Sequence, residues 1–374
     1  MQGVAALEGE VSSFFAASSA DPSIEGADLL IGVLPFDRDG TVLLIQPERV
    51  ERGEGWGVAA SPLSVPPIKT RRIVELPSAA TYAEMVRKAL QRLAAPIKGG
   101  ARTEEQSADT PLRKVVLARS LLIEAQEAVD PLEIAGRLAE DETVLTFLLD
   151  LSAQAGAPPC SMVGATPELL LSRQGRQVAS HPLAGSARRH EDAVMDRQAA
   201  EALLRSEKDQ REHAMVVESI LDGLSPYCAR LSTPGGMSLR STATMWHLGT
   251  RIEGVLKGDD APSAAGLAAL LHPTPAVGGD PRDAALQLIR DLEPQERGYY
   301  AGAFGWVDGR GDGEWYVTLR CARIEGDQLT LHAGAGIVPG SDPADEVAET
   351  AAKFRAMLRA LGVDEQYVVL EKVA

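Results

Sequence analysis

The sequence predicts an α+β fold in which antiparallel strand pairs pack against layers of helices. Two observations lead to this class. Apolar segments of strand length come in pairs around tight-turn signals, and blocks with apolar residues at helical spacing separate these pairs. The chain has 374 residues, 45% of them hydrophobic, so it can bury one large core or two ordinary ones.

The N-terminal third contains the first predicted elements. Residues 29–45 read as two strands around an Asp39-Gly40 turn, and a Pro- and Ser-rich stretch over 61–69 makes this an edge region. Apolar residues at helical spacing over 82–93 predict a helix that Pro96 and the following glycines end. A polar loop over 97–111 then separates this third from the rest of the chain.

The remaining predicted elements follow the loop in order. They are strands from Lys114 and Thr143, a hairpin over 168–183 that turns at Gln174-Gly175, two helices over 192–224, a helix over 263–271, strand pairs over 302–324 and 328–338, and a last helix from Asp342 to about Leu361. Asp342 caps this last helix and Pro343 occupies its first position.

Composition excludes several classes of function. The formal net charge of −16, with no run of Lys and Arg, argues against nucleic acid as a partner. No window of 18 apolar residues and no signal-peptide pattern occurs, so we expect a cytoplasmic protein without a membrane contact. Three widely spaced cysteines predict reduced thiols. Nothing in the sequence sets the oligomeric state, and a monomer is compatible with it.

Lys114 opens a strand whose two faces are otherwise apolar, so its amine points inward or snorkels to water. A lysine acts as a base at neutral pH only in a dry site. Glu168 opens the hairpin and is either exposed or buried for a purpose. Arg320, predicted within the strand over 314–324, can hold a carboxylate in two parallel hydrogen bonds or lie at the surface.

Four acids on two helices form a further candidate site. Asp209 and Glu212 extend the apolar stripe of their helix, and Glu346 and Glu349 lie at i and i+3 on the last helix. They are either solvated surface carboxylates or a converging oxygen-only set, which suits Mg²⁺. No histidine spacing predicts another metal site, and no serine-histidine-aspartate set can be assembled.

Taken in order, these segments resemble the chorismate-utilising enzymes, the family of anthranilate, aminodeoxychorismate, salicylate and isochorismate synthases. The resemblance covers about residues 112–362, which we take as the catalytic region, with 1–111 as a variable N-terminal part of one domain spanning 1–374. The segments that carry it are KVVLAR, GATPELLL, HPLAGSARR, KDQREH, MWHLGT, LLHPTPAVGGDP, GYYAGAFGWVDGRGDGEWYVTLRCA, AGAGIVPGSDP and EVAETAAKF. The family fold implies two large, mainly antiparallel sheets packed together and flanked by helices.

The resemblance implies a role for each candidate residue. Lys114 would be the base that activates water, and Glu168 the acid that protonates the departing C4 hydroxyl. Glu212 and Glu349 would bind Mg²⁺, with Asp209 and Glu346 acting through water. The residues that would contact or lie beside chorismate are Gly185, Ser186, His247, Tyr300, Arg320, Gly334, Gly336 and Lys353. Magnesium, Arg320 and Lys353 would supply the positive field that an acidic protein needs to bind a dianion.

Three positions favour the isochorismate synthase branch of the siderophore type. Enzymes that add ammonia resemble one another in having glutamine where this chain has Lys114, because water needs a base and ammonia does not. Ala184 stands where aminodeoxychorismate synthases carry a nucleophilic lysine, so no glutaminase subunit is expected. Ala276 stands where salicylate synthases have threonine, although Tyr300 departs from one isochorismate synthase subgroup, which has phenylalanine there.

The resulting hypothesis is a reversible, magnesium-dependent isomerisation of chorismate to isochorismate, and it requires Glu168 to have a raised pKa. The alternative within the family is salicylate synthase, which goes on to eliminate pyruvate. A third reading is an inert chorismate- or metal-binding regulator, although such a protein would not need Lys114 together with Glu168. The product could serve siderophore, menaquinone or salicylate biosynthesis.

Overall fold

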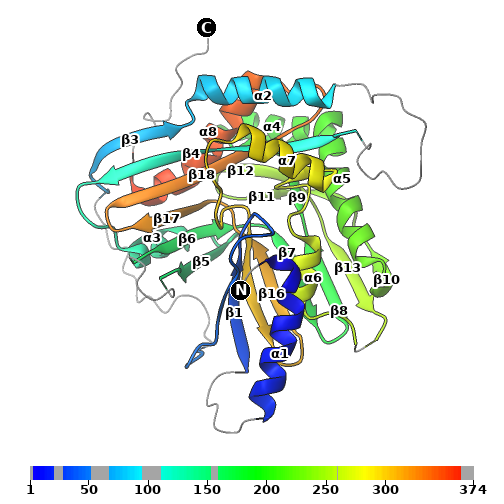
Figure 1. Ribbon diagram of the computed structural model, residues 1–374. Helices are drawn as coiled ribbons and strands as arrows, with labels where there is room; N and C mark the ends of the chain where they lie inside the picture. Colours follow the sequence, from blue (N-terminus) through cyan, green and yellow to red (C-terminus); the bar gives the residue numbers. More distant parts are fainter. Residues whose placement is uncertain are drawn as a thin grey trace.

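The computed structural model describes residues 3–20, 28–51, 67–94, 111–152, 159–258 and 260–363. Two large antiparallel sheets lie side by side, and helices cover their outer faces (Figure 1). The predicted α+β class with two large sheets is therefore confirmed. The predicted loop over 97–111 and most of the Pro- and Ser-rich stretch over 61–69 fall outside the described residues.

The larger sheet joins the first strands of the chain to later hairpins. Its strands run in the order β10 (Cys228–Ser232), β13 (Ile252–Leu256), β8 (Gln177–His181), β7 (Leu169–Gln174), β16 (Gly313–Val317), β15 (Ala303–Asp308), β1 (Leu29–Leu34) and β2 (Leu43–Ile45). The hairpin of β7 and β8 turns where the sequence predicts it. β2 ends the order, so the N-terminal strands do form an edge.

The second sheet carries the predicted base at one end of its long central strand. Its order is β14 (Gly279–Asp280), β4 (Lys114–Ala125), β18 (Gln328–Ile337), β17 (Cys321–Glu325), β6 (Ser161–Thr166) and β5 (Leu145–Asp150), with β3 (Thr70–Leu76) pairing to β4. β4 and β18 pair over ten residues, from Val115 opposite Ile337 to Glu124 opposite Gln328.

A third sheet of three strands was not predicted. It consists of β11 (Met237–Ser241), β12 (Met245–Thr250) and β9 (Leu183–Arg188). Its β9–β12 pairing shifts register beside His247, which lies opposite Ser186. This small sheet therefore brings two of the predicted substrate contacts together.

The strand predicted over 314–324 is interrupted, and this part of the prediction was wrong. β16 ends at Val317, and β17 begins at Cys321 in the other sheet. Arg320, in the connection, has a φ of 46°, which a continuous strand does not allow. The chain crosses between the sheets here, so Arg320 belongs to neither strand, although its carbonyl accepts a hydrogen bond from the Ala165 amide of β6 at 3.1 Å.

Helices close both sheets. They are α1 (Leu7–Ala20), α2 (Ala79–Leu93), α3 (Pro131–Leu138), α4 (Ala193–Arg205), α5 (Glu207–Leu224), α6 (Ala264–Leu271), α7 (Arg282–Leu292) and α8 (Pro343–Leu361), with a short 3-10 turn at Val4–Ala6. Three of them, α1, α3 and α7, lie outside the elements predicted from sequence. Ser206 separates α4 from α5 because its side chain accepts a hydrogen bond from the Asp209 amide at the start of α5.

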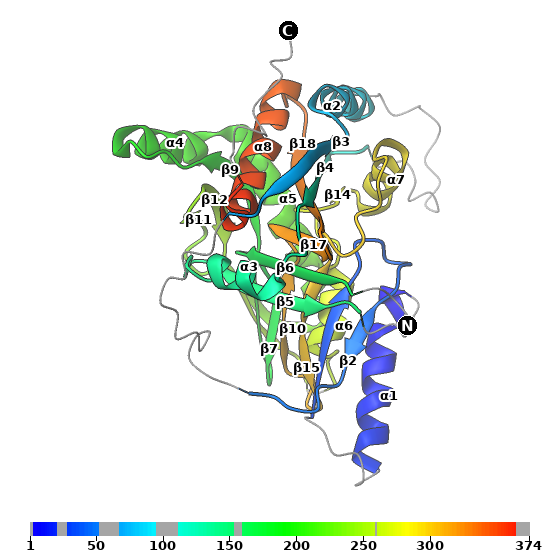
Figure 2. The same cartoon turned by 90° about the vertical axis from the view of Figure 1, so that its left-hand side faces the viewer.

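The main core joins apolar residues of both large sheets to those of the helices that cover them. Phe147 of β5 and Phe304 of β15 contact each other across it with ring centroids 4.1 Å apart. The three cysteines are buried and free of disulfides, as expected. Among the described helices, none combines the length and apolarity needed to cross a bilayer. Figure 2 shows α1 beside α6, and the two helices contact each other.

Candidate active site

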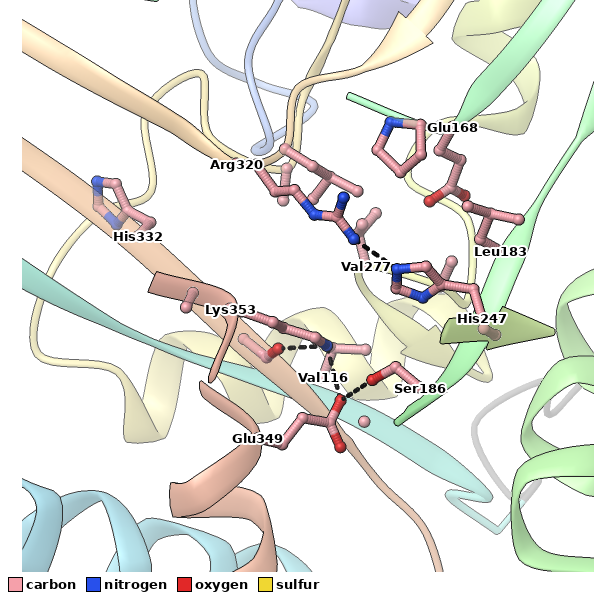
Figure 3. Close-up of a pocket in the computed structure, with 18 of the residues that line it drawn as sticks. Val116, Glu168, Leu183, Ser186, His247, Val277, Arg320, His332, Glu349 and Lys353 are labelled. Atoms are coloured by element: carbon pink, nitrogen blue, oxygen red, sulfur yellow. Dashed lines mark hydrogen bonds and ion pairs between the residues drawn. The ribbon is translucent and has the colours of Figure 1, made fainter. Parts of the chain in front are cut away.

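A pocket opens where the three sheets meet, and it collects most of the predicted site residues. Those that line it are Glu168, Gly185, Ser186, Glu212, His247, Tyr300, Arg320, Gly334, Gly336, Glu349 and Lys353. They come from β9, β12 and β18, from helices α5 and α8, and from connections between strands. Residues far apart in sequence thus converge on one cavity (Figure 3).

Lys114, Asp209 and Glu346 are the predicted site residues that lie behind this lining. The Lys114 side chain is wholly buried, which excludes the alternative in which it reaches water. Its Nζ lies 2.9 Å from Glu212 Oε1, yet the amine has no well-directed hydrogen bond among the described groups. Lys114 is therefore held at the site by charge, through a carboxylate that itself lines the pocket.

Glu168 is buried between β6 and β7, with 3% of its surface exposed. Burial raises the pKa of this carboxyl to about 8, because the ion loses its hydration. The Leu183 amide and the charges of Lys114, Lys353 and Arg320 oppose the shift without cancelling it. Glu168 is thus protonated at neutral pH, as a general acid must be.

Arg320 and His247 contact each other directly in the lining of the pocket (Figure 3). Arg320 Nη2 donates to His247 Nε2, so the imidazole proton must sit on Nδ1. Burial, together with the charges of Arg320 and Lys353, holds the pKa of His247 well below its usual value. Burial also lowers the pKa of Arg320 to about 10, which still leaves a guanidinium at neutral pH. The pair is one cation and one neutral ring, ready to receive an anion.

A second cation lies opposite. Lys353 Nζ contacts Glu349 Oε1 at 2.7 Å and donates to the Gly334 carbonyl at 2.9 Å. Ser186 Oγ donates to the same Glu349 oxygen at 3.0 Å. This ion pair and hydrogen bond lower the pKa of Glu349 in spite of its burial. Glu349 is therefore charged, with its second oxygen left for another partner (Figure 3).

The acidic groups fit a hard cation in their chemistry. Glu346 Oε2 is buried and without a hydrogen-bond partner, while its Oε1 pairs with Lys208 Nζ at 2.8 Å. A Cβ at Gly336 would lie only 2.1 Å from Glu212 Oε1, so the glycine leaves the room that this carboxylate occupies. Within the described residues, no three acidic, thiol or imidazole groups already form a metal cage. Such a set suits Mg²⁺, which needs few carboxylates and takes water and substrate oxygens as well.

Arg297 was missed from sequence although it lines the pocket. Its Nη1 donates to the Val277 carbonyl at 2.8 Å and its Nη2 to the Val116 carbonyl at 2.7 Å, while Glu293 neutralises its charge. It joins the segment after α6 to β4, the strand of Lys114. The sequence around Arg297, a turn beside Gly298, does not indicate a buried site residue. Arg297 becomes buried only because β4 and α7 pack together in the folded chain.

His332 was also missed. Its ring stacks on Tyr300 at a centroid distance of 4.9 Å, and burial lowers its pKa to about 4. Burial likewise raises the pKa of Tyr300, so its hydroxyl stays protonated. The two neutral rings thus stack on each other in the lining of the pocket.

The fold and the pocket define an enzyme that acts on a small, multiply charged acid. The chain belongs to the family of chorismate-binding enzymes, whose model matches residues 81–362. Isochorismate synthase DhbC of Bacillus subtilis is 42% identical to it over 347 residues, 92% of this chain and 83% of that protein. Isochorismate synthase EntC of Escherichia coli strain K12 is 38% identical over 354 residues, 93% of this chain and 85% of that protein.

Solved structures agree with this assignment. A DhbC from Bacillus anthracis, described as a 2,3-dihydroxybenzoate-specific isochorismate synthase, superposes with a TM-score of 0.84 and 36% identity, covering 97% of this chain and 91% of that one. The menaquinone-specific isochorismate synthase MenF of Escherichia coli shares the fold, with a TM-score of 0.73 at 23% identity. The resemblance found in the sequence motifs is thereby confirmed.

Proposed function

We propose that the protein is an isochorismate synthase, which reversibly isomerises chorismate to isochorismate by adding water at C2 and releasing the C4 hydroxyl. The observation that carries the proposal is a buried carboxyl with a raised pKa, Glu168, in the lining of the pocket, with the wholly buried amine of Lys114 directly behind that lining. The names of relatives up to 42% identical over most of the chain support the same activity.

The two residues divide the proton transfers between them. Lys114 is the proposed base, whose amine accepts the proton of the water that attacks C2. Glu168 gives its proton to the hydroxyl that leaves C4, as the ring electrons shift. In the return direction each residue takes the other's role, which restores both protonation states.

The remaining residues hold the substrate. Arg320 supplies a planar pair of donors for one carboxylate, and Lys353 supplies a second cation. Mg²⁺ held by Glu212 and Glu349, with Asp209 and Glu346 behind, would neutralise these acids and polarise the other carboxylate. Tyr300 and His332 exclude water from the face of the ring. Holding the ring between Glu168 and Lys114 lowers the entropic cost of the reaction, because the acid, the base and the substrate are already oriented.

The first experiment is incubation of the purified protein with chorismate and MgCl₂, with an EDTA control, and chromatographic separation of isochorismate, salicylate and pyruvate. Isochorismate that forms only with magnesium is the expected result. Stoichiometric salicylate and pyruvate would assign the salicylate synthase activity instead. Chorismate binding without turnover would refute both activities and leave the inert regulator.

The relatives of this chain include a vibriobactin-specific isochorismate synthase and MenF proteins. We therefore propose that the product is used in siderophore or menaquinone synthesis.

A further inference from the structure

The strand that carries Lys114 has an open stretch on one edge. β14 pairs with Lys114 and Val115 of β4, and β3 pairs with β4 from Ser120 onwards. Among the described strands, none pairs with residues 116–119 on this edge. Backbone amides and carbonyls buried in such a gap need other hydrogen-bond partners.

An ion pair fills the open stretch. Glu293, which directly follows α7, accepts a hydrogen bond from the Ala118 amide at 2.8 Å. Arg297 Nη2 donates to the Val116 carbonyl at 2.7 Å. The side chains of Glu293 and Arg297 therefore bind two backbone groups that a neighbouring strand would otherwise pair.

The ion pair itself is buried and held in one geometry. Its side chains are 5% exposed for Glu293 and 3% for Arg297, and Arg297 Nε donates to Glu293 Oε2 at 2.8 Å. The guanidinium also lies over the Phe36 ring, 4.1 Å from its centroid. Each of the three guanidinium nitrogens already donates to the protein, so Arg297 lines the pocket as a support and not as a substrate contact.

The same guanidinium holds a wall of the pocket against β4. Its Nη1 donates to the Val277 carbonyl at 2.8 Å, and the Val116 amide donates to the Gly278 carbonyl at 2.8 Å. A Cβ at Gly279 would lie only 2.3 Å from the Lys114 carbonyl oxygen, so this wall lies directly against the start of β4. Val116 and Val277 both line the pocket.

We propose that Glu293 and Arg297 are positioning residues, which replace the missing strand beside β4 and thereby fix Lys114 and the Val277 wall relative to the substrate. The inference rests on the proposed function, because it takes Lys114 as the base. On this edge the start of β4 is otherwise held only by the two residues of β14. A displacement of about 1 Å in an active site can lower the rate about 100-fold, so the position of this strand end matters for turnover.

The first test variant is Arg297→Lys, assayed with chorismate. Lysine keeps the charge beside Glu293 but lacks the planar fork that serves Glu293 and both carbonyls at once. We expect kcat to fall about tenfold or more, because Lys114 moves with β4. KM should rise by a smaller factor, since Arg320 and Lys353 belong to other elements.

Glu293→Asp is the second variant, in case the first does not fold. The shorter side chain keeps the negative charge, but it cannot reach the Ala118 amide and the guanidinium together. We expect the same pattern as in Arg297→Lys, with kcat lowered more than KM is raised.

The matched control is Arg173→Lys. Arg173 is as well buried as Arg297, and its Nη1 donates to the carbonyls of Ala261 and Pro262 at 3.1 and 2.9 Å, outside the lining of the pocket. This variant should lose thermal stability as Arg297→Lys does, but its kcat should be unchanged.

Hydrogen exchange at residues 114–118, measured by mass spectrometry, gives a readout that does not need turnover. We expect faster exchange there in Arg297→Lys and Glu293→Asp, and an unchanged rate in Arg173→Lys. Unchanged exchange and unchanged kcat in the two test variants would overturn the inference.

The remaining outcomes also decide. A raised KM with unchanged kcat would make Arg297 a substrate contact, and an equal loss of kcat in Arg173→Lys would reduce the effect to general stability; either result overturns the inference. The unmodified enzyme is assayed first. Absence of turnover there refutes the proposed function, whereas the exchange measurement still shows whether Glu293 and Arg297 hold β4.

Discussion

Glu168 shows at the scale of one residue how burial creates an acid. Of the carboxyl groups described in the pocket lining, Glu212 and Glu349 each form an ion pair, whereas Glu168 forms none. Loss of hydration therefore decides the protonation of Glu168. The forward reaction needs the protonated form, which is present below a pKa of about 8 and lost above it. The sequence predicted the raised pKa only through the role that the resemblance implied.

We therefore expect kcat/KM for chorismate to decline as the pH rises through about 8, because Glu168 then loses the proton it must donate. A pH profile of the initial rate checks this.

Glu168→Gln should lower kcat at least 100-fold and still bind chorismate, since an amide fills the space without an acidic proton. If Glu168→Gln kept substantial activity and the same decline of kcat/KM at high pH, Glu168 would be ruled out as the acid.

Gly336 gives a second prediction at this scale. Gly336→Ala places a methyl group 2.1 Å from Glu212 Oε1 and 3.2 Å from Lys114 Cε, so the carboxylate must move. We expect turnover to fall at least tenfold while the circular dichroism spectrum is retained, because a displacement of about 1 Å in a site is costly.

The matched control for this change is Gly136→Ala. Gly136 lies inside α3, and a Cβ there meets nothing within 4 Å. This variant should keep full activity and gain about 0.5–1 kcal/mol of stability. Full activity of Gly336→Ala would contradict the tight packing of Glu212 against β18.

At the scale of elements, the N-terminal part of the chain holds α6 at both ends. Glu8 of α1 accepts hydrogen bonds from the Ser263 amide and hydroxyl at the start of α6. Arg38 donates to the carbonyl of Ala269 at 3.0 Å and to that of His272, where the helix ends. The segment after α6 contributes Ala276 and Val277 to the pocket. The N-terminal elements therefore fix one wall of the site from outside.

Arg38→Ala should weaken this attachment. Removing charged donors from buried carbonyls costs about 1–3 kcal/mol, and the freed segment carries a pocket wall. We expect a lower melting temperature and a KM for chorismate raised several-fold. Arg38→Lys, which keeps a donor, should restore part of both. A variant that melts earlier with unchanged KM would show that the attachment serves stability alone.

For the whole molecule, the clustering of acids at the site affects stability. Glu346 illustrates the cost: burial first, and the neighbouring Glu349 second, raise its pKa to about 7. A ligand that binds only the folded state stabilises it by mass action, by about 2.7 kcal/mol at one hundred times its dissociation constant. A cation that neutralises these acids should therefore stabilise the entire chain.

Added MgCl₂ should raise the melting temperature of the protein, and EDTA should reverse the rise. Sodium chloride at equal ionic strength controls for screening, which is not site-specific. Glu349→Gln should lose most of the magnesium-dependent rise, because it removes one proposed ligand. An identical rise in this variant would place the binding of magnesium elsewhere.

The sequence by itself determined the α+β class, most of the strands and helices, and the residue types of the site. Alternating apolar positions, turn residues and caps are local signals, so the β7–β8 hairpin and α8 with its Asp342 cap could be predicted from them. The apolar pattern on β4 left two orientations open for Lys114, inward or towards water, and the structure decides for the buried one.

Only the tertiary structure decided what those residues do together. The sheet crossing at Arg320, the three-stranded sheet that brings His247 to Ser186, and the burial of Arg297 depend on contacts between elements far apart in the chain. The same holds for the raised pKa of Glu168 and for the partner of Lys114. Desolvation and ion pairing depend on the neighbours that a residue acquires only when the sheets pack together. The periodicity of apolar residues along one strand or helix does not indicate which neighbours these are.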